Sequence, residues 1–384
     1  MAKFSTALPR SMLQMLGAAL LAATGAGCAP LQTEGLRVLE SPPAEHPPAY
    51  GELAFRSGQL AVSDARSPLN LLIALLPQHY HRFTHIGLIE VVDGTAWLYE
   101  AQGRLSLLPG SGPPTDRISG AVRRIPLAEL VRRNGYVEIY DPPPGLDVTA
   151  TLDYARRQME LGTPFDPYFD ETGHAALYCS EFVALALHAG GQPLAALLPS
   201  RSNPSLRRAL DWLGVRAHGS WQPGTLVAGG RHVATLSSDR TRSQAALHFA
   251  VREELHRRFT ADQRIGYVFR WTGQGLTLRA PVAEFVSAAE HLVDRNAAPP
   301  PPAHLRRQVR ALANAHFGRL RPAAPVALGS GDTAASAPRG AAIPVPDDRR
   351  PDHPAGGDPA LPQNLAPAAA SGGTPPFRAS RTDF

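Results

Sequence analysis

The chain has 384 residues, a formal net charge of +5 and 43% hydrophobic residues. That length is enough to bury a sizeable core in one or two domains. Lys3 is the only lysine, and no cluster of arginines is interleaved with aromatic residues, which argues against binding to DNA or RNA. The only cysteines are Cys28 and Cys179, so an exported form would depend on its core rather than on disulfides for stability.

The first residues have the pattern of a bacterial lipoprotein signal. Basic residues precede an apolar run at 12–23, and small residues at 24–27 lead into Cys28. The run is too short for a comfortable membrane span. We therefore expect a signal peptide at 1–27 and a lipid on Cys28, which would anchor the protein in the bacterial cell envelope. Ala29 is not an acidic retention residue, which favours the outer membrane, facing the periplasm. An ordinary signal peptide and an uncleaved anchor are the alternatives.

The remaining chain divides into four parts by composition. A proline-bearing tether is expected at 28–48, and residues 49–200 alternate strand and helix signals. Residues 201–321 have mostly helical patterns. Residues 322–384 are rich in Ala, Pro, Gly and Asp, so we predict a disordered tail that cannot bury enough apolar surface to fold.

Residues 49–200 have an order of elements typical of an α+β fold with a central antiparallel sheet. The boundaries follow from apolar runs, turn residues and helix-capping signals. In chain order we expect a strand at 51–56, a helix at 69–76, strands at 85–91, 96–102 and 121–125, a helix at 127–133, a strand at 136–140, and helices at 148–161 and 182–189.

The dipeptide Asp93-Gly94 predicts a tight hairpin between two of these strands, because Asp-Gly suits a two-residue type I′ turn. In that register His85 lies opposite Gln102, and Glu100 is the diagonal neighbour of His85, so the three share one face. The diagonal gap of about 7 Å is within reach of a glutamate and an imidazole. A three-residue loop would send Glu100 to the opposite face.

Cys179 stands where an irregular segment gives way to the apolar helix at 182–189. The dipole of a helix favours thiolate over thiol at that end, and thiolate is the nucleophilic form. A thiol at a helix start, a histidine on a strand and a polar residue on the next strand form the papain-type arrangement. There the histidine moves the thiol proton and the third residue orients the imidazole. Papain-like chains normally run cysteine first, whereas here His85 and Glu100 precede Cys179.

Five segments of the chain then resemble one family in their order and spacing: the circularly permuted NlpC-type papain-like hydrolases, the YaeF/YiiX group. The resemblance covers roughly residues 49–195. The segments are GELAFRSG at 51–58, FTHIGL at 83–88, YEA at 99–101, GTPFD at 162–166 and YCSEFV at 178–183.

This resemblance implies a permuted papain-like fold with Cys179 as the nucleophile, His85 as the base and Glu100 as the orienting residue. It also implies an exported amidase of cell-wall peptides or, as in relatives similar to lecithin:retinol acyltransferase, an acyl-transfer enzyme that works on lipids. The chain departs from the family by a longer insertion between Gln102 and Ala121, and by a C-terminal region that the resemblance does not place.

Each site residue also has a simpler structural interpretation. Cys179 could be an inert buried thiol, His85 a core histidine, and Glu100 the ion-pair partner of an arginine. Gln102 competes with Glu100 for the orienting role. Glu181 lies in the first turn of the helix, where a carboxylate suits the dipole, so we expect it to cap the helix rather than to take part in chemistry.

Two further histidines, His79 and His81, precede His85 and raise the question of a metal site. No acidic or sulfur ligand lies near them in the sequence, and both fall in an expected loop, so we expect no metal and no cofactor. Tyr178 could contribute to an oxyanion site beside the backbone N–H of Cys179, and the sequence leaves that open.

The sequence therefore predicts an exported, lipid-anchored cysteine hydrolase that cleaves an amide bond of a cell-wall peptide through an acyl-enzyme on Cys179, with His85 as general base. An alternative in the same class is an acyltransferase or esterase acting on membrane lipid. An alternative of another class is a non-catalytic envelope lipoprotein that binds or scaffolds a partner. The expected partners are a peptidoglycan peptide or a lipid acyl substrate, and the membrane through Cys28.

Overall fold

The computed structural model describes residues 33–105, 118–167, 169, 173–194, 200–201, 219–261, 268–272 and 275–320. The signal peptide predicted at 1–27, the lipidation predicted at Cys28 and the tail predicted at 322–384 lie outside the described residues. All described residues belong to one compact unit, which spans Met1–Pro322.

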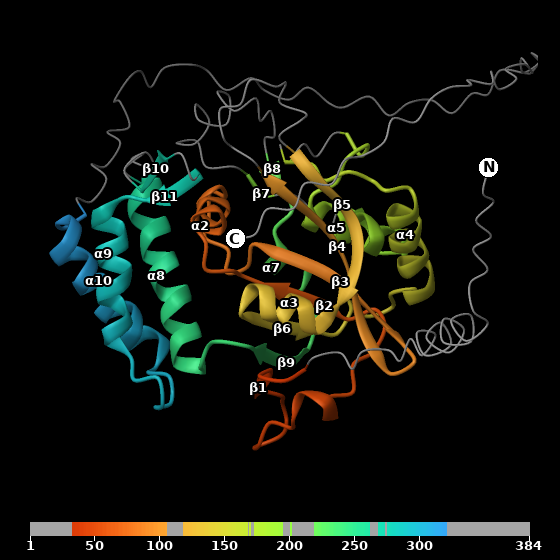
Figure 1. Cartoon of the computed structure of the whole chain (residues 1–384), viewed down its shortest axis with the longest axis horizontal. Helices are drawn as coiled ribbons and strands as arrows, with labels where there is room; N and C mark the ends of the chain where they lie inside the picture. Colours follow the sequence, from red (N-terminus) through yellow and green to blue (C-terminus); the bar gives the residue numbers. More distant parts are fainter. Residues whose placement is uncertain are drawn as a thin grey trace, which may run out of the picture. The chain divides into compact units, whose positions relative to one another are not determined.

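Among the described residues, seven strands form one sheet, and every neighbouring pair in it is antiparallel (Figure 1). The predicted α+β class with a central antiparallel sheet is therefore confirmed. In spatial order the strands are β1 (Arg37–Glu40), β9 (His232–Ser237), β6 (Tyr136–Tyr140), β2 (Leu60–Ser63), β3 (His85–Val92), β4 (Thr95–Leu105) and β5 (Ile118–Pro126).

Helices flank this sheet, and two short ribbons complete the described elements. The helices are α2 (Pro68–Leu75), α3 (Leu127–Asn134), α4 (Val148–Glu160), α5 (Cys179–Ala189), α7 (Pro223–Leu226), α8 (Arg242–Ala261), α9 (Ala280–Ala289) and α10 (Pro302–Phe317), with 3₁₀ turns η1 (Tyr50–Glu52) and η6 (Glu290–Leu292). The ribbons pair β7 (Ser200–Arg201) with β8 (Gly219–Ser220) and β10 (Phe269–Thr272) with β11 (Gly275–Leu278).

Two features of the sheet differ from the expected elements. The strand predicted at 51–56 is wrong: η1 occupies its start, and the strand β2 lies later, at Leu60–Ser63. The whole of β2 is buried, so it lacks the alternation that marks a half-exposed strand. The strand β9 comes from the region expected to be mostly helical, and its six residues are too few for a periodic pattern to stand out.

The hairpin between β3 and β4 has the predicted two-residue turn. Val92 pairs with Thr95, and the same register continues to the pair Leu88 and Tyr99. Asp93 and Gly94 have φ angles of 50° and 75°, the left-handed conformation that both central positions of a type I′ turn require. The register that places Glu100 on the same face as His85 is therefore confirmed.

The two faces of the sheet bury different side chains, as the period of two along a strand requires. Leu60 and Leu88 point into a core closed by α4 and α5, whereas Ala61 and Ile89 point into one closed by α3. A third core joins α2, α8, α9 and α10, and Figure 1 shows the last three side by side. By the same alternation, His85 and Glu100 lie on the α3 face with Ile89 and Leu98. Cys179 meets them at the start of β3, where its sulfur lies 3.8 Å from the carbonyl oxygen of Thr84.

Candidate active site

Cys179 is the first residue of α5 and is 7% exposed. The helix begins here because Tyr178 is extended, and the carboxylate of Glu181 accepts a hydrogen bond from the Tyr178 backbone N–H at 3.4 Å. Glu181 therefore caps the helix, as its position predicts. The Cys179 sulfur is buried at the positive end of α5, 3.8 Å from the carbonyl oxygen of Thr84, the residue before β3.

His85 is the first residue of β3 and shares the buried site with Cys179 and Glu100. Its Nε2 atom lies 2.6 Å from the Oε2 atom of Glu100, and the neighbouring Cys179 side chain helps to raise the pKa of the ring. Glu100 reaches His85 from the neighbouring strand β4 because the two are diagonal neighbours on one face of the hairpin. The structure thus brings together all three residues that the sequence singles out as catalytic.

Gln102 makes no hydrogen bond to His85 in this arrangement. Its amide nitrogen lies 3.4 Å from the carbonyl oxygen of the next residue, Gly103. Of the two side chains that the sequence leaves open as the orienting residue, the one placed against His85 is Glu100.

Two arginines hold the far side of the Glu100 carboxylate. Arg123 donates from Nε and from a terminal nitrogen to Oε1, at 3.0 and 2.9 Å. Arg133 donates to both carboxylate oxygens, at 2.9 and 2.6 Å. Glu100 is fully buried, whereas the side chains of Arg123 and Arg133 are 42% and 27% exposed. Glu100 is therefore both the partner of His85 and the ion-pair partner of two arginines, two roles that the sequence presents as alternatives.

Sequence reasoning missed both arginines. Arg123 lies directly opposite Glu100 on β5, and Arg133 is in the last turn of α3, which packs on β4. The register of β5 could have identified Arg123, but the sequence between β4 and β5 carries no hairpin signal as clear as Asp93-Gly94. No local pattern marks Arg133, because its approach to β4 is a product of tertiary packing.

The environment sets opposite charges on His85 and Glu100. Burial opposes the charge on Glu100, but hydrogen bonds from His85 and Arg133 outweigh it and hold the pKa of this carboxyl well below its ordinary range. Burial also opposes the charge on His85, but hydrogen bonds to Cys179 and Glu100 outweigh it and raise the pKa of the imidazole to about 9. At neutral pH the pair is an imidazolium and a carboxylate.

The same contacts define which nitrogen of His85 faces the sulfur. An ionised carboxylate can only accept hydrogen bonds, so Nε2 donates to Glu100. The nitrogen left for Cys179 is Nδ1. The sulfur therefore has the imidazolium of His85 and the positive end of α5 as its neighbours.

Other polar residues near the start of α5 have structural partners. The hydroxyl oxygen of Tyr178 accepts a hydrogen bond from the backbone N–H of Trp221 at 3.1 Å, and Ser180 donates to the Trp221 carbonyl at 2.6 Å. His174 lies 2.8 Å from Glu181 through Nδ1. These contacts fix the segment before Cys179 against the strand β8 region.

His79 and His81 precede β3 in the irregular segment where the sequence places them. Among the described residues, no group of three His, Cys, Asp or Glu side chains is arranged to hold a metal ion.

Comparison with known proteins gives one weak structural likeness. No family model matches the chain, and no curated protein matches its sequence. The crystal structure of the metalloprotein YiiX from Escherichia coli O157:H7 is similar to it at 17% identity and a TM-score of 0.36, over 47% of this chain and 96% of that one. YiiX is a member of the YaeF/YiiX group.

Proposed function

We propose that this chain is a cysteine hydrolase that cleaves an amide bond in a cell-wall peptide, with Cys179 as nucleophile and His85 as general acid and base. The observation that carries the proposal is the buried contact of 2.6 Å between His85 and Glu100, beside the Cys179 thiol at the start of α5. A core histidine or an inert thiol requires neither a charged partner nor a helix N-terminus.

The reaction follows from the position of each proton. The Cys179 thiolate attacks the carbonyl carbon, and the negative charge that develops on the carbonyl oxygen is favoured near the N-terminal N–H groups of α5. His85 gives its Nδ1 proton to the amine as the C–N bond breaks, which leaves a thioester on Cys179. His85 then takes a proton from water as the water attacks the thioester, and the acid product leaves.

Glu100 acts on His85 and does not touch the substrate in this mechanism. It orients the ring and stabilises the imidazolium, as the third member of a triad does. Arg123 and Arg133 keep its carboxylate ionised. Counting the thiolate and Glu100 against the imidazolium and the two arginines leaves one net positive charge, and this suits a substrate with free carboxylates, such as a cell-wall peptide.

Thiol reactivity across pH tests the catalytic role. The full chain with Cys28→Ser carries Cys179 as its single cysteine. We expect alkylation by a small neutral haloacetamide to be fast at neutral pH and to slow strongly in a His85→Ala background, with Cys179→Ser as the blank. A slow reaction that follows the pH dependence of an ordinary thiol, and that His85→Ala does not change, would refute the proposal.

Mass spectrometry then identifies the substrate class. Incubation with peptidoglycan fragments should leave a peptide-derived acyl group on Cys179, seen after rapid acid quench, and Cys179→Ser should carry none. An acyl group acquired from phospholipid vesicles instead would replace the amidase proposal with the lipid acyltransferase alternative.

We also propose that Cys28 carries a lipid and anchors the protein in the bacterial cell envelope. The support is the sequence pattern before Cys28. No helix within the described residues is long and apolar enough to cross a membrane. Intact mass of the purified chain tests the anchor: we expect loss of residues 1–27 and added acyl mass, both abolished by Cys28→Ser. An unmodified Cys28 in the mature protein would contradict it.

A further inference from the structure

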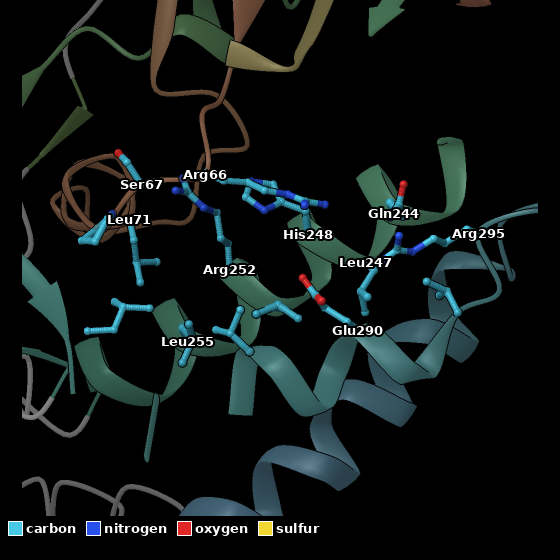
Figure 2. Close-up of a pocket in the computed structure, with 15 residues that line it drawn as sticks. Arg66, Ser67, Leu71, Gln244, Leu247, His248, Arg252, Leu255, Glu290 and Arg295 are labelled. Carbon is cyan, nitrogen blue, oxygen red and sulfur yellow. The ribbon is translucent and has the colours of Figure 1, made fainter. Parts of the chain in front are cut away.

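A cavity of about 190 Å³ lies between α2, α8 and the segment formed by α9 and η6 (Figure 2). It lies on the helical side of the fold, in the third core, and the proposed reaction does not use it. Cys179, His85 and Glu100 are absent from its described lining. The cavity therefore needs an explanation separate from the active site.

The body of the cavity is apolar. Leu247, Val251 and Leu255 lie four residues apart on α8 and form one stripe along that helix. Leu71 of α2 and Val286 of α9 close the cavity from the other sides. All of these are leucine or valine, so the interior offers an alkyl chain the same contacts as a protein core.

The edge of the cavity is charged. Arg66, just before α2, and Arg295, just after η6, are exposed residues of the lining, and Glu290 is its exposed acidic residue. Figure 2 shows Arg66 close to Arg252 and His248, with Arg295 on the other side of the cavity. The two exposed arginines against one glutamate leave the entrance net positive.

His248 and Arg252, which line the inner wall of the cavity, both contact the carboxylate of Asp64. Asp64 accepts from Arg252 at 2.6 Å and lies 2.8 Å from Nε2 of His248. Burial lowers the pKa of His248 to about 4, despite Asp64, so the imidazole is neutral at neutral pH. The Asp64 carboxylate also accepts from Thr84 at 2.7 Å, so this wall is held rigidly. The charge available to a ligand is therefore that of Arg66 and Arg295.

The volume limits the size of the occupant. An apolar cavity of ~150 Å³ is enough to bind benzene, a ring of six carbons. By that comparison, a volume of about 190 Å³ holds an alkyl chain of about six carbons. A chain slightly longer would bring its polar end to the entrance.

We propose that this cavity binds a medium-chain amphiphile with one anionic end, its alkyl chain against Val251 and Leu255 and its carboxylate or phosphate between Arg66 and Arg295. An anion is favoured over a cation by the charge of the entrance, and an alkyl chain over a polar group by the lining. The anionic end could come from a free fatty acid or from a phospholipid, and the probes below separate the two.

Calorimetric titration of the full chain tests the proposal. The chain carries Cys28→Ser so that it can be handled without detergent, which would itself compete for the cavity. We expect octanoate or octyl phosphate to bind in a 1:1 ratio, with the tighter of the two identifying the source of the anion. Octyltrimethylammonium has a chain of the same length and should bind at least about tenfold more weakly, a difference of ~1.4 kcal/mol.

Variants locate the binding. Arg66→Glu with Arg295→Glu should weaken the anionic probes by about tenfold or more, since both arginines are exposed and neither is in the core. Arg307→Glu is the matched control, because Arg307 is exposed on α10 and outside the described lining. Val286→Phe should abolish binding by filling the cavity, provided the variant keeps its circular dichroism spectrum.

Three results would overturn the proposal: no saturable heat with either anion, equal affinity for the cationic probe, or equal weakening by Arg307→Glu and by the Arg66 and Arg295 pair. Each is measured without reference to thiol chemistry, and the titration is repeated in Cys179→Ser. Failure of the hydrolase proposal would leave these affinities unchanged.

Discussion

The Nε2 atom of His85 lies 2.6 Å from the Oε2 atom of Glu100, and neither side chain is more than a tenth exposed. The same carboxylate binds Arg123 and Arg133. Burial favours the neutral form of a carboxyl group, but two guanidinium groups and an imidazole outweigh burial here and keep Glu100 ionised. Because it can then only accept hydrogen bonds, Nε2 of His85 must carry a proton and donate to it, which leaves Nδ1 for Cys179.

Replacing Glu100 with Gln should shift the pH dependence of Cys179 alkylation. The pKa of His85 is raised to about 9 in part by Glu100, so the imidazolium persists into basic solution. With Glu100→Gln the imidazolium should lose its proton at lower pH, and the rate at neutral pH should fall by about tenfold to a hundredfold. Alkylation rates measured from pH 5 to 10 check this. If the basic part of the pH–rate profile of Glu100→Gln coincided with that of the wild type, Glu100 would not act on His85.

Removing Arg133 should make the fold more sensitive to acid. The pKa of Glu100 is held down partly by Arg133, so Arg133→Ala should raise it, and the stability that depends on the carboxylate should be lost at higher pH as the solution is acidified. At neutral pH we expect a loss of about 1–3 kcal/mol, the usual effect of a hydrogen bond to a buried charge. Urea unfolding at pH 4 and pH 7 measures both.

Arg157→Ala is the control for that variant, because Arg157 is exposed on α4 and is not among the hydrogen-bond partners of Glu100, which are His85, Arg123 and Arg133. It should change the free energy of unfolding by less than about 0.5 kcal/mol. Equal losses in the two variants would mean that the Arg133 contact with Glu100 contributes nothing specific.

The local part of the site could be predicted from the sequence. Asp93-Gly94 determines a two-residue turn, and the turn determines which strand positions share a face, so the neighbourhood of His85 and Glu100 followed from geometry alone. The position of Cys179 at a helix start likewise followed from the change from irregular to apolar sequence.

The long-range part could not. Arg123 reaches Glu100 through a strand pairing that no short turn determines, and Arg133 reaches it through the packing of α3 on β4. The strand β9 pairs with β6 although it lies nearly a hundred residues later in the chain, and no sequence feature of either strand identifies the other as its partner. Such pairings depend on the whole core rather than on a local pattern.

The free energy of unfolding should fall as pH rises from 6.5 to above 9. A group whose folded pKa is raised contributes stability that is complete below its unfolded pKa, about 6.5 for histidine, and that is lost as pH rises through the folded value. For His85 that value is about 9, so the loss is on the order of 3 kcal/mol. Urea unfolding at pH 6 and pH 10 should show this fall in the wild type and a smaller one in His85→Ala.

Gly87→Ala should weaken both the fold and the site, because a side chain at Gly87 on β3 would collide with β4. A Cβ atom there would come within 2.7 Å of the Tyr99 carbonyl oxygen and 2.8 Å of the Leu98 side chain. The backbone contact cannot yield without moving β3 away from β4, and overpacking of this kind lowers stability by about 1–3 kcal/mol. Since His85 is two residues away on β3 and Glu100 is on β4, their contact should lengthen too.

Gly51→Ala is the matched control for this substitution, because a Cβ atom at Gly51 would meet no atom within 4 Å. It should leave the urea midpoint and the alkylation rate of Cys179 near those of the wild type. We expect Gly87→Ala to lower both, and a variant that unfolds earlier yet keeps its full alkylation rate would show that Cys179 reactivity does not depend on how closely β3 and β4 hold His85 and Glu100.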